Sequence, residues 1–160
     1  MNKLLAALFF SLVTVAAGCA GPRQVSRLDY PADTAAAAGA EVERSDTLLI
    51  LVHGRMDTAK AFDEEGLIKD LRERGSTADI VSLGAAPDLF RRRIFADSVE
   101  HQVVEPAREQ GYQRIFIVGI SRGGMGVLTY ARKYPNSVDG VLAIAPFLGP
   151  RALVEDLERQ

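Results

Sequence analysis

Five consecutive residues, Gly119-Ile120-Ser121-Arg122-Gly123, place a serine between two glycines. A serine hydroxyl is a weak nucleophile, and a sharp turn between a strand and a helix is one way to expose its oxygen. The flanks of such a turn are crowded, so only small residues fit there. An apolar run precedes this segment and further glycines follow it. The pattern predicts that Ser121 is a nucleophile for acyl chemistry.

A second interpretation of the same segment is a glycine-rich turn, for example a phosphate-binding loop, that carries an incidental serine. The nucleotide-binding versions need either the full G-x-G-x-x-G spacing or a lysine directly before Ser or Thr. Neither feature is present here, so the nucleophile is the favoured interpretation.

His53-Gly54 closes an apolar run and is the second signal. In a fold built around a nucleophile turn, the loop after this strand can aim a backbone N–H at a developing oxyanion. We expect the two oxyanion donors to be the N–H groups of Arg122 and Arg55. His53 itself could serve as a general base, but holding the loop is the favoured role.

Alternating apolar runs and amphipathic stretches predict βαβ units with a parallel sheet. The expected strands span residues 47–52, 78–83, 114–119 and 138–145. The expected helices span residues 59–74, 96–110 and 123–134, with Pro106 bending or shortening the second. Right-handed crossovers would bring the carboxyl ends of all four strands to one edge, where such sheets bind ligands.

The first residues read as a targeting segment and not as part of the fold. Lys3 precedes an apolar run over residues 4–15 that is too short to span a bilayer, and Ala16-Ala17-Gly18 follows. The next residue is Cys19, so this stretch resembles a bacterial lipobox, in which the cysteine becomes lipidated. Secretion with an incidental thiol is the alternative. We expect a signal peptide over 1–18, lipidation at Cys19, and a location in the bacterial cell envelope facing the periplasm or exterior.

Residues 19–45 show no sustained apolar periodicity and predict a tether, although a short strand could lie within 25–30 or 40–44. The domain proper would then cover residues 46–160.

Composition excludes several functional classes. The 160 residues carry a net charge of only −2, and the basic residues are scattered apart from Arg91-Arg92-Arg93, so nucleic acid is not an expected partner. That triplet favours a solvated charge run over a contact with an acidic substrate. One cysteine excludes an internal disulfide, and two histidines do not suggest a zinc site. We predict no metal and no cofactor.

Three motifs together resemble the α/β-hydrolase superfamily, and more narrowly its bacterial esterase-like members. They are LLILVHG at 48–54, GISRGGMG at 119–126, and a helix that ends in ARKYP before VDGV at 138–141. The resemblance covers about residues 45–150. It implies an α/β fold with a mostly parallel sheet and helices on both faces, here partial, with the later strands missing. It also implies a small-molecule acyl or ester substrate, and acid and histidine partners that follow the serine.

The chain departs from this pattern because no histidine follows Ser121. His101 precedes the serine, and a surface or packing role fits it better than that of a base. We therefore expect a truncated serine hydrolase that is inactive as given, since a triad acts as a unit. The alternative is a non-catalytic envelope lipoprotein or a degenerate hydrolase that binds acyl ligands. The sequence leaves substrate identity and oligomeric state open.

Overall fold

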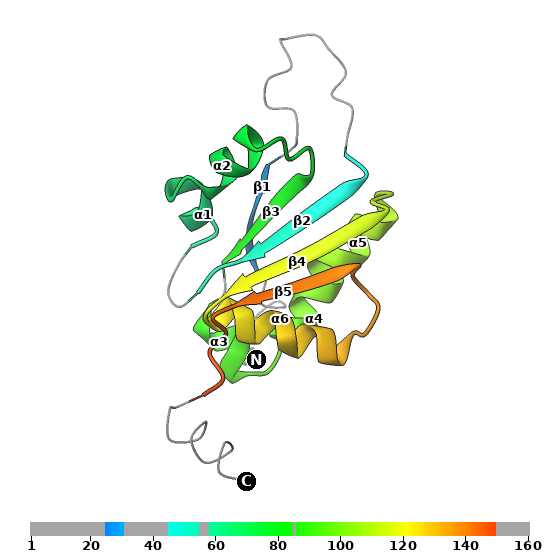
Figure 1. The fold of residues 1–160 in the computed structure, drawn as a ribbon. Coiled ribbons are helices and arrows are strands. Elements are labelled where there is room, and N and C mark those ends of the chain that lie inside the picture. The colour runs from blue at the N-terminus through cyan, green and yellow to red at the C-terminus, as the bar shows by residue number, and fades with distance from the viewer. Residues whose placement is uncertain (1–24, 31–44, 55–57, 85, 150–160) are drawn as a thin grey trace, which may run out of the picture.

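A five-stranded sheet forms the centre of the molecule (Figure 1). The structure is a computed structural model that describes residues 25–30, 45–54, 58–84 and 86–149. The strands are β1 (Ser26–Tyr30), β2 (Thr47–Val52), β3 (Asp79–Gly84), β4 (Arg114–Ile120) and β5 (Gly140–Ile144). They lie in the order β1-β3-β2-β4-β5; β2 to β5 are parallel and β1 is antiparallel to β3.

The predicted strands and the α/β fold class are confirmed. Each apolar run became a strand, and the most apolar, β2, lies between β3 and β4. Its side chains alternate between two cores: Ile50 and Val52 belong to the larger, and Leu51 belongs to the smaller. Such continuous apolar runs are typical of parallel strands buried on both faces.

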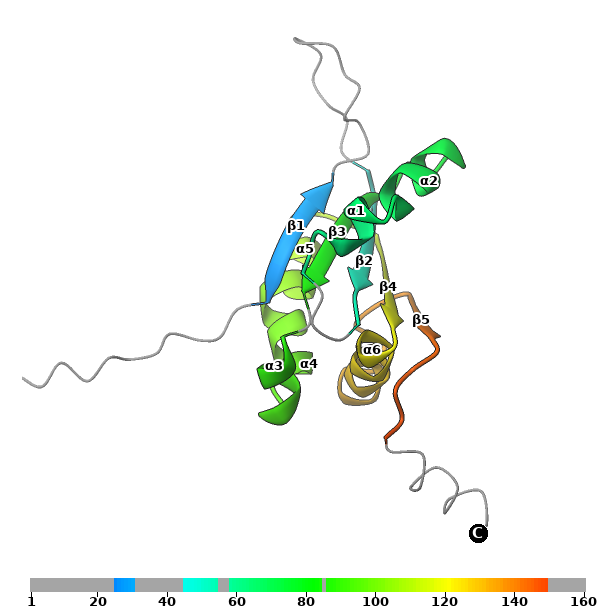
Figure 2. The same cartoon turned by 90° about the vertical axis from the view of Figure 1, so that its left-hand side faces the viewer.

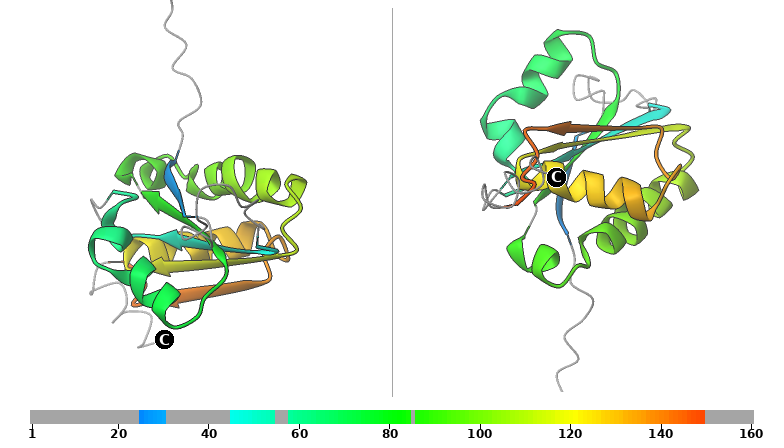
Figure 3. Two further views of the ribbon diagram at one scale, coloured as in Figure 1. Left: turned by 90° about the horizontal axis from the view of Figure 1, so that it is seen from above. Right: turned by 60° about the horizontal axis from the view of Figure 1, so that its bottom comes forward.

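Helices cover both faces of the sheet (Figures 2 and 3). The helices are α1 (Ala61–Glu64), α2 (Leu67–Glu73), α3 (Pro87–Arg91), α4 (Phe95–Val99), η1 (Glu100–Val104), α5 (Glu105–Glu109) and α6 (Arg122–Lys133). Side chains from α3 to α6 form the larger core with one face of the sheet, whereas α1 and α2 pack on the other face.

The helix predicted over residues 59–74 is wrong as a single element. It is broken into α1 and α2 at Gly66, which has φ +82°. Glycine reaches this left-handed conformation without steric cost, so the chain can turn there. The side chains of Phe62 and Ile68 are nevertheless buried on the same face of the sheet. This shared face explains why the apolar spacing suggested one helix.

The helix predicted over residues 96–110 is present without a break, but its backbone hydrogen-bonding pattern changes along the segment. The segment runs through α4, the π-helical turn η1 and α5. Pro106 has no N–H to give to the carbonyl of Gln102, four residues earlier. That carbonyl instead accepts a hydrogen bond from Nη1 of Arg27 at 3.1 Å, and the Gln102 side chain accepts the N–H of Val25 at 3.0 Å. The proline therefore changes the helix and frees a carbonyl that anchors β1.

The short strand that the sequence left open within residues 25–30 is present, so the tether prediction is wrong for residues 26–30. These residues form β1, an edge strand that pairs with β3 from Ser26–Gly84 to Tyr30–Ile80. Arg27 and Asp29 form an ion pair at 2.9 Å on this edge, and their charges made the segment look unlike a strand. The signal peptide, Cys19 and the rest of the tether up to residue 44 lie outside the described residues. Within the described ranges, no helix is long and apolar enough to cross a membrane.

Asp139 fastens the start of β5 to β4. Its carboxylate accepts the N–H of Ile115 at 2.7 Å and a hydrogen bond from Arg108 at 2.9 Å, while its own N–H donates to the Ile115 carbonyl. The Ile115 N–H, followed by the Arg108 guanidinium, lowers the pKa of this carboxyl below its usual range.

We predict that Asp139→Asn makes stability less sensitive to acid. A carboxyl whose pKa is lower in the folded than in the unfolded chain stabilises the fold above its unfolded pKa of about 3.9. This stabilisation is lost as pH falls through the folded pKa. Urea unfolding from pH 6 down to pH 2.5 should therefore show a shallower decline for Asp139→Asn than for the wild type. Equal declines would contradict this role.

Candidate active site

Ser121 occupies a strained turn between β4 and α6. β4 ends at Ile120 and α6 begins at Arg122, so the reversal from strand to helix falls on one residue. The backbone of Ser121 has φ +55° and ψ −113°, a conformation that residues with a side chain rarely adopt. Strain of this kind costs of the order of 1–3 kcal/mol and persists only where the surroundings hold it.

Two glycines allow the turn to close. A Cβ on Gly119 would lie 2.3 Å from the carbonyl oxygen of Gly123. A Cβ on Gly123 would lie 2.2 Å from the oxygen of Val52 and 2.6 Å from that of His53. Both glycines in the sequence pattern are thus required by contact with backbone, which cannot move aside as a flexible side chain could.

The segment after β5 holds the backbone of Ser121 from the other side. The Ser121 N–H donates to the carbonyl of Ile144 at 3.0 Å, and the N–H of Phe147 donates to the Ser121 carbonyl at 2.9 Å. Pro146 packs against Gly124, with 2.9 Å between its Cα and a Cβ built there. Sequence reasoning missed this support; the Ala145-Pro146 pair at the end of an apolar strand was its available signal.

Of the two residues expected to donate to an oxyanion, only Arg122 lies within the described residues, and its role stays a prediction. Arg122 is the first residue of α6, and the first N–H groups of a helix have no partner inside it. Its N–H is therefore oriented by the same turn that presents Ser121. Arg55 lies outside the described residues, so its expected role stays a prediction.

His53 is a buried residue at the carboxyl end of β2. Its Nδ1 accepts the N–H of Gly54 at 2.7 Å, its Nε2 lies 3.4 Å from Oε2 of Glu65, and its ring contacts Phe62 at 4.6 Å between centroids. The ring thus connects the end of β2 to α1. These contacts fit the favoured role of holding the loop better than that of a base for Ser121.

His101 lies on η1 and its side chain is exposed. It pairs with Glu105 at 2.8 Å, and this contact raises the pKa of the imidazole. Its ring also meets the edge of Tyr134. These contacts fit the surface role expected for His101.

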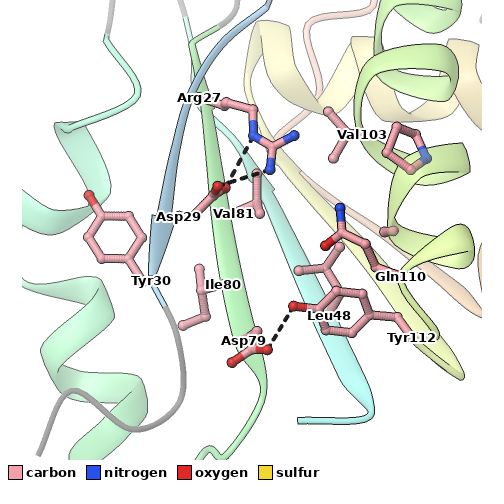
Figure 4. Close-up of a pocket in the computed structure, with 12 residues that line it drawn as sticks. Arg27, Asp29, Tyr30, Leu48, Asp79, Ile80, Val81, Val103, Gln110 and Tyr112 are labelled. Atoms are coloured by element: carbon pink, nitrogen blue, oxygen red, sulfur yellow. Dashed lines mark hydrogen bonds and ion pairs between the residues drawn. The ribbon is translucent and has the colours of Figure 1, made fainter. Parts of the chain in front are cut away.

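A cavity of about 310 Å³ opens at the amino ends of the parallel strands, opposite the edge that carries Ser121 (Figure 4). Leu48 and Asp79, at the amino ends of β2 and β3, line it together with residues of β1, η1 and α5. Tyr112 donates a hydrogen bond to Asp79 at 2.7 Å within its wall. Since the carboxyl ends of the parallel strands carry Ser121, this cavity is separate from the candidate site. Among the described residues, no three His, Cys, Asp or Glu side chains lie together as metal ligands would.

The comparisons with known proteins agree with this geometry. A family model described as "Serine aminopeptidase, S33" matches residues 91–159, which include Ser121. A monoacylglycerol lipase from Paleococcus ferrophilus has a similar structure, with a TM-score of 0.53 and 17% identity over 86% of this chain. MenH from S. aureus gives a TM-score of 0.53 and 14% identity over 84% of the chain. The chain has the α/β-hydrolase fold.

The predicted resemblance to the α/β-hydrolase superfamily is thereby confirmed at the level of the fold. A ferulic acid esterase is also similar, with a TM-score of 0.50 and 20% identity over 65% of the chain. The chain spans about half of these proteins, namely 51% of the lipase and 47% of MenH and of the esterase. None of the curated proteins compared matches the sequence.

We predict that Gly123→Ala destabilises the fold by about 3 kcal/mol or more, because the new Cβ meets two backbone oxygens that cannot yield without moving β2. Gly111→Ala is the matched control: Gly111 has φ +95° but open space around it, so only the backbone strain of about 1 kcal/mol applies. The free energy of unfolding in urea measures both. Equal costs for the two variants would show that the close approach at Gly123 does not constrain the turn.

Proposed function

We propose that the chain carries the nucleophile and oxyanion half of a serine hydrolase acting on carboxylic esters or related acyl substrates. The observation that carries the proposal is the strained backbone of Ser121 between β4 and α6, closed by Gly119 and Gly123. The turn lies at the carboxyl edge of a parallel sheet, where α/β proteins bind their ligands, and a turn of this kind is one way to expose a serine oxygen.

In the proposed reaction the Ser121 oxygen attacks the acyl carbonyl and forms a new C–O bond. The hydroxyl proton passes to a base, and the Arg122 N–H stabilises the negative charge that develops on the carbonyl oxygen. Collapse of this intermediate breaks the bond to the alcohol, which leaves with a proton. Water then cleaves the acyl-serine ester and regenerates Ser121.

The base is the part that this sequence does not supply in the usual order. Acid and histidine follow the serine in this fold, and residues 122–160 contain no histidine. A base in that order would come from residues outside this sequence. Oxyanion donors and substrate binding alone retain roughly 10³–10⁴-fold acceleration over water in enzymes stripped of a triad member. We therefore propose weak Ser121 chemistry in the chain alone, in place of the complete inactivity expected from the sequence.

The similar proteins favour ester substrates, since they include a monoacylglycerol lipase and a ferulic acid esterase. The competing function is acyl-ligand binding without turnover. The two proposals differ in one respect: only the hydrolase forms a covalent bond to Ser121.

We predict that added imidazole accelerates acylation of the full chain by p-nitrophenyl butyrate, because it supplies a base in place of the histidine that residues 122–160 do not contain. Intact-mass analysis should show a butyryl adduct that forms at least about ten-fold faster with imidazole than without it. Ser121→Ala should lose this adduct, and Ser76→Ala, the control, should keep it. An adduct of unchanged yield in Ser121→Ala would place the chemistry elsewhere, whereas no adduct in any protein would favour the binding function.

We also propose that Cys19 anchors the protein to a bacterial membrane through acyl chains, with the domain facing the periplasm or exterior. The small residues before the chain's single cysteine support this proposal. Lipid chains contribute about 0.8 kcal/mol per buried methylene, so two or more would hold the protein stably.

Cys19→Ala should move the protein from the membrane to the soluble or precursor fraction and abolish labelling by an alkyne-tagged fatty acid. Ser26→Ala is a control that leaves the tripeptide and Cys19 intact and should keep both. Unchanged labelling and partitioning in Cys19→Ala would reject the anchor.

A further inference from the structure

A second cavity, of about 260 Å³, lies beside the first turns of α6. Side chains of α3, α4 and α6 and of the link between α3 and α4 line it: Phe90, Arg93, Phe95, Ala96, Met125 and Thr129. Both α3 and the start of α6 lie at the carboxyl ends of the parallel strands (Figure 1).

Most of the lining is apolar and firmly packed. The rings of Phe90 and Phe95 stack with 4.6 Å between centroids and 14° between planes. Both rings press on α6 at Gly126, where a Cβ would lie 2.7 Å from Phe95 and 3.0 Å from Phe90. The Thr129 hydroxyl donates a hydrogen bond to the Met125 carbonyl, so this hydroxyl needs no polar partner in the cavity. The space therefore suits a hydrocarbon.

Arg93 is the one charged residue in this lining. Its backbone has φ +56°, a conformation that is uncommon for a residue with a side chain and recurs at ligand clamps. Arg91 pairs with Asp88 at 3.3 Å, but no described carboxylate pairs with Arg93. A guanidinium has five donors in a planar fork, so with no partner among the described carboxylates it is suited to a carboxylate ligand.

The cavity and Ser121 share the first turn of α6. Met125 lines the cavity, and its N–H donates to the Ser121 carbonyl at 3.1 Å. One residue of the lining, Met125, therefore lies one helical turn after Ser121.

We propose that this cavity binds a short linear aliphatic carboxylate, with its chain against Phe90, Phe95 and Met125 and its carboxylate on Arg93. At about 30 Å³ per water-sized group, the cavity of about 260 Å³ holds roughly nine such groups, enough for a six-carbon acid. The step from this ligand to a substrate rests on the proposed hydrolase function. If that function holds, the substrates are esters whose acyl chain carries a carboxylate at its far end. The triplet Arg91-Arg92-Arg93 then contains one specificity residue and not three equivalent solvated charges.

Hexanoate and 1-hexanol separate the charge from the chain. Binding to the full chain is followed by NMR of ¹³C-methyl methionine, and Met125→Leu identifies the Met125 signal among three methionines. We expect hexanoate to shift this signal and to bind at least about ten-fold more weakly in Arg93→Gln. Arg92→Gln, a neighbouring loss of the same charge outside the lining, should bind hexanoate like the wild type. Hexanol should bind the wild type and Arg93→Gln equally.

Thr129→Phe fills the cavity and should abolish the binding of both hexanoate and 1-hexanol. Circular dichroism should show an unchanged fold. Ser121→Ala should leave hexanoate binding unaltered, so a failure of the hydrolase proposal is seen separately from a failure of this one. No shift of the Met125 signal by hexanoate, or equal losses in Arg92→Gln and Arg93→Gln, would overturn the proposal.

Discussion

The structure depends on one steric constraint: the backbone of the turn at Ser121 approaches itself and β2 so closely that no Cβ fits at Gly119 or Gly123. This approach sets the position of α6 against the carboxyl ends of β2 and β4. A larger residue at either position would separate α6 from the sheet and release the turn. The two glycines are therefore required by packing, whatever chemistry the serine performs.

The strain at Ser121 is offset by interactions that come from distant parts of the chain. Ile144 and Phe147 bond both polar groups of the Ser121 backbone, and each such bond contributes about 1 kcal/mol net. This is comparable to the 1–3 kcal/mol that the strained conformation costs. Since Asp139 holds β5 against β4, the carboxylate at one end of β5 indirectly supports the turn at the other end.

The sequence predicted the parallel strands well because a strand buried on both faces must be apolar throughout. It predicted the turn because only glycine satisfies that steric demand. β1 was only an alternative to the tether in the sequence, since an edge strand that is half exposed carries Arg27 and Asp29 and has little apolar pattern. The break at Gly66 and the π-turn before Pro106 also escaped prediction, because both depend on how hydrogen bonds are redistributed in three dimensions. Cys19 and Arg55 lie outside the described residues, so their predicted roles rest on the sequence alone.

The candidate site combines a well-defined turn at Ser121 with few described residues that could act together with the serine. The chain has two histidines, His53 and His101. Their rings contact the carboxylates of Glu65 and Glu105 respectively. The described part of the α/β-hydrolase fold thus holds Ser121 in a strained turn at the start of α6. Its edge strand β5 is apolar and leaves Leu142 55% exposed.

Covalent labelling by an activated alkyl phosphonate, with the adduct located by tandem mass spectrometry, tests most directly whether the turn presents Ser121 for chemistry. A phosphonate mimics the tetrahedral intermediate and bonds irreversibly to the serine that attacks it. We expect one dominant adduct, on Ser121, that forms in the folded chain and is lost in urea. Labelling spread over several serines, or undiminished by unfolding, would contradict it.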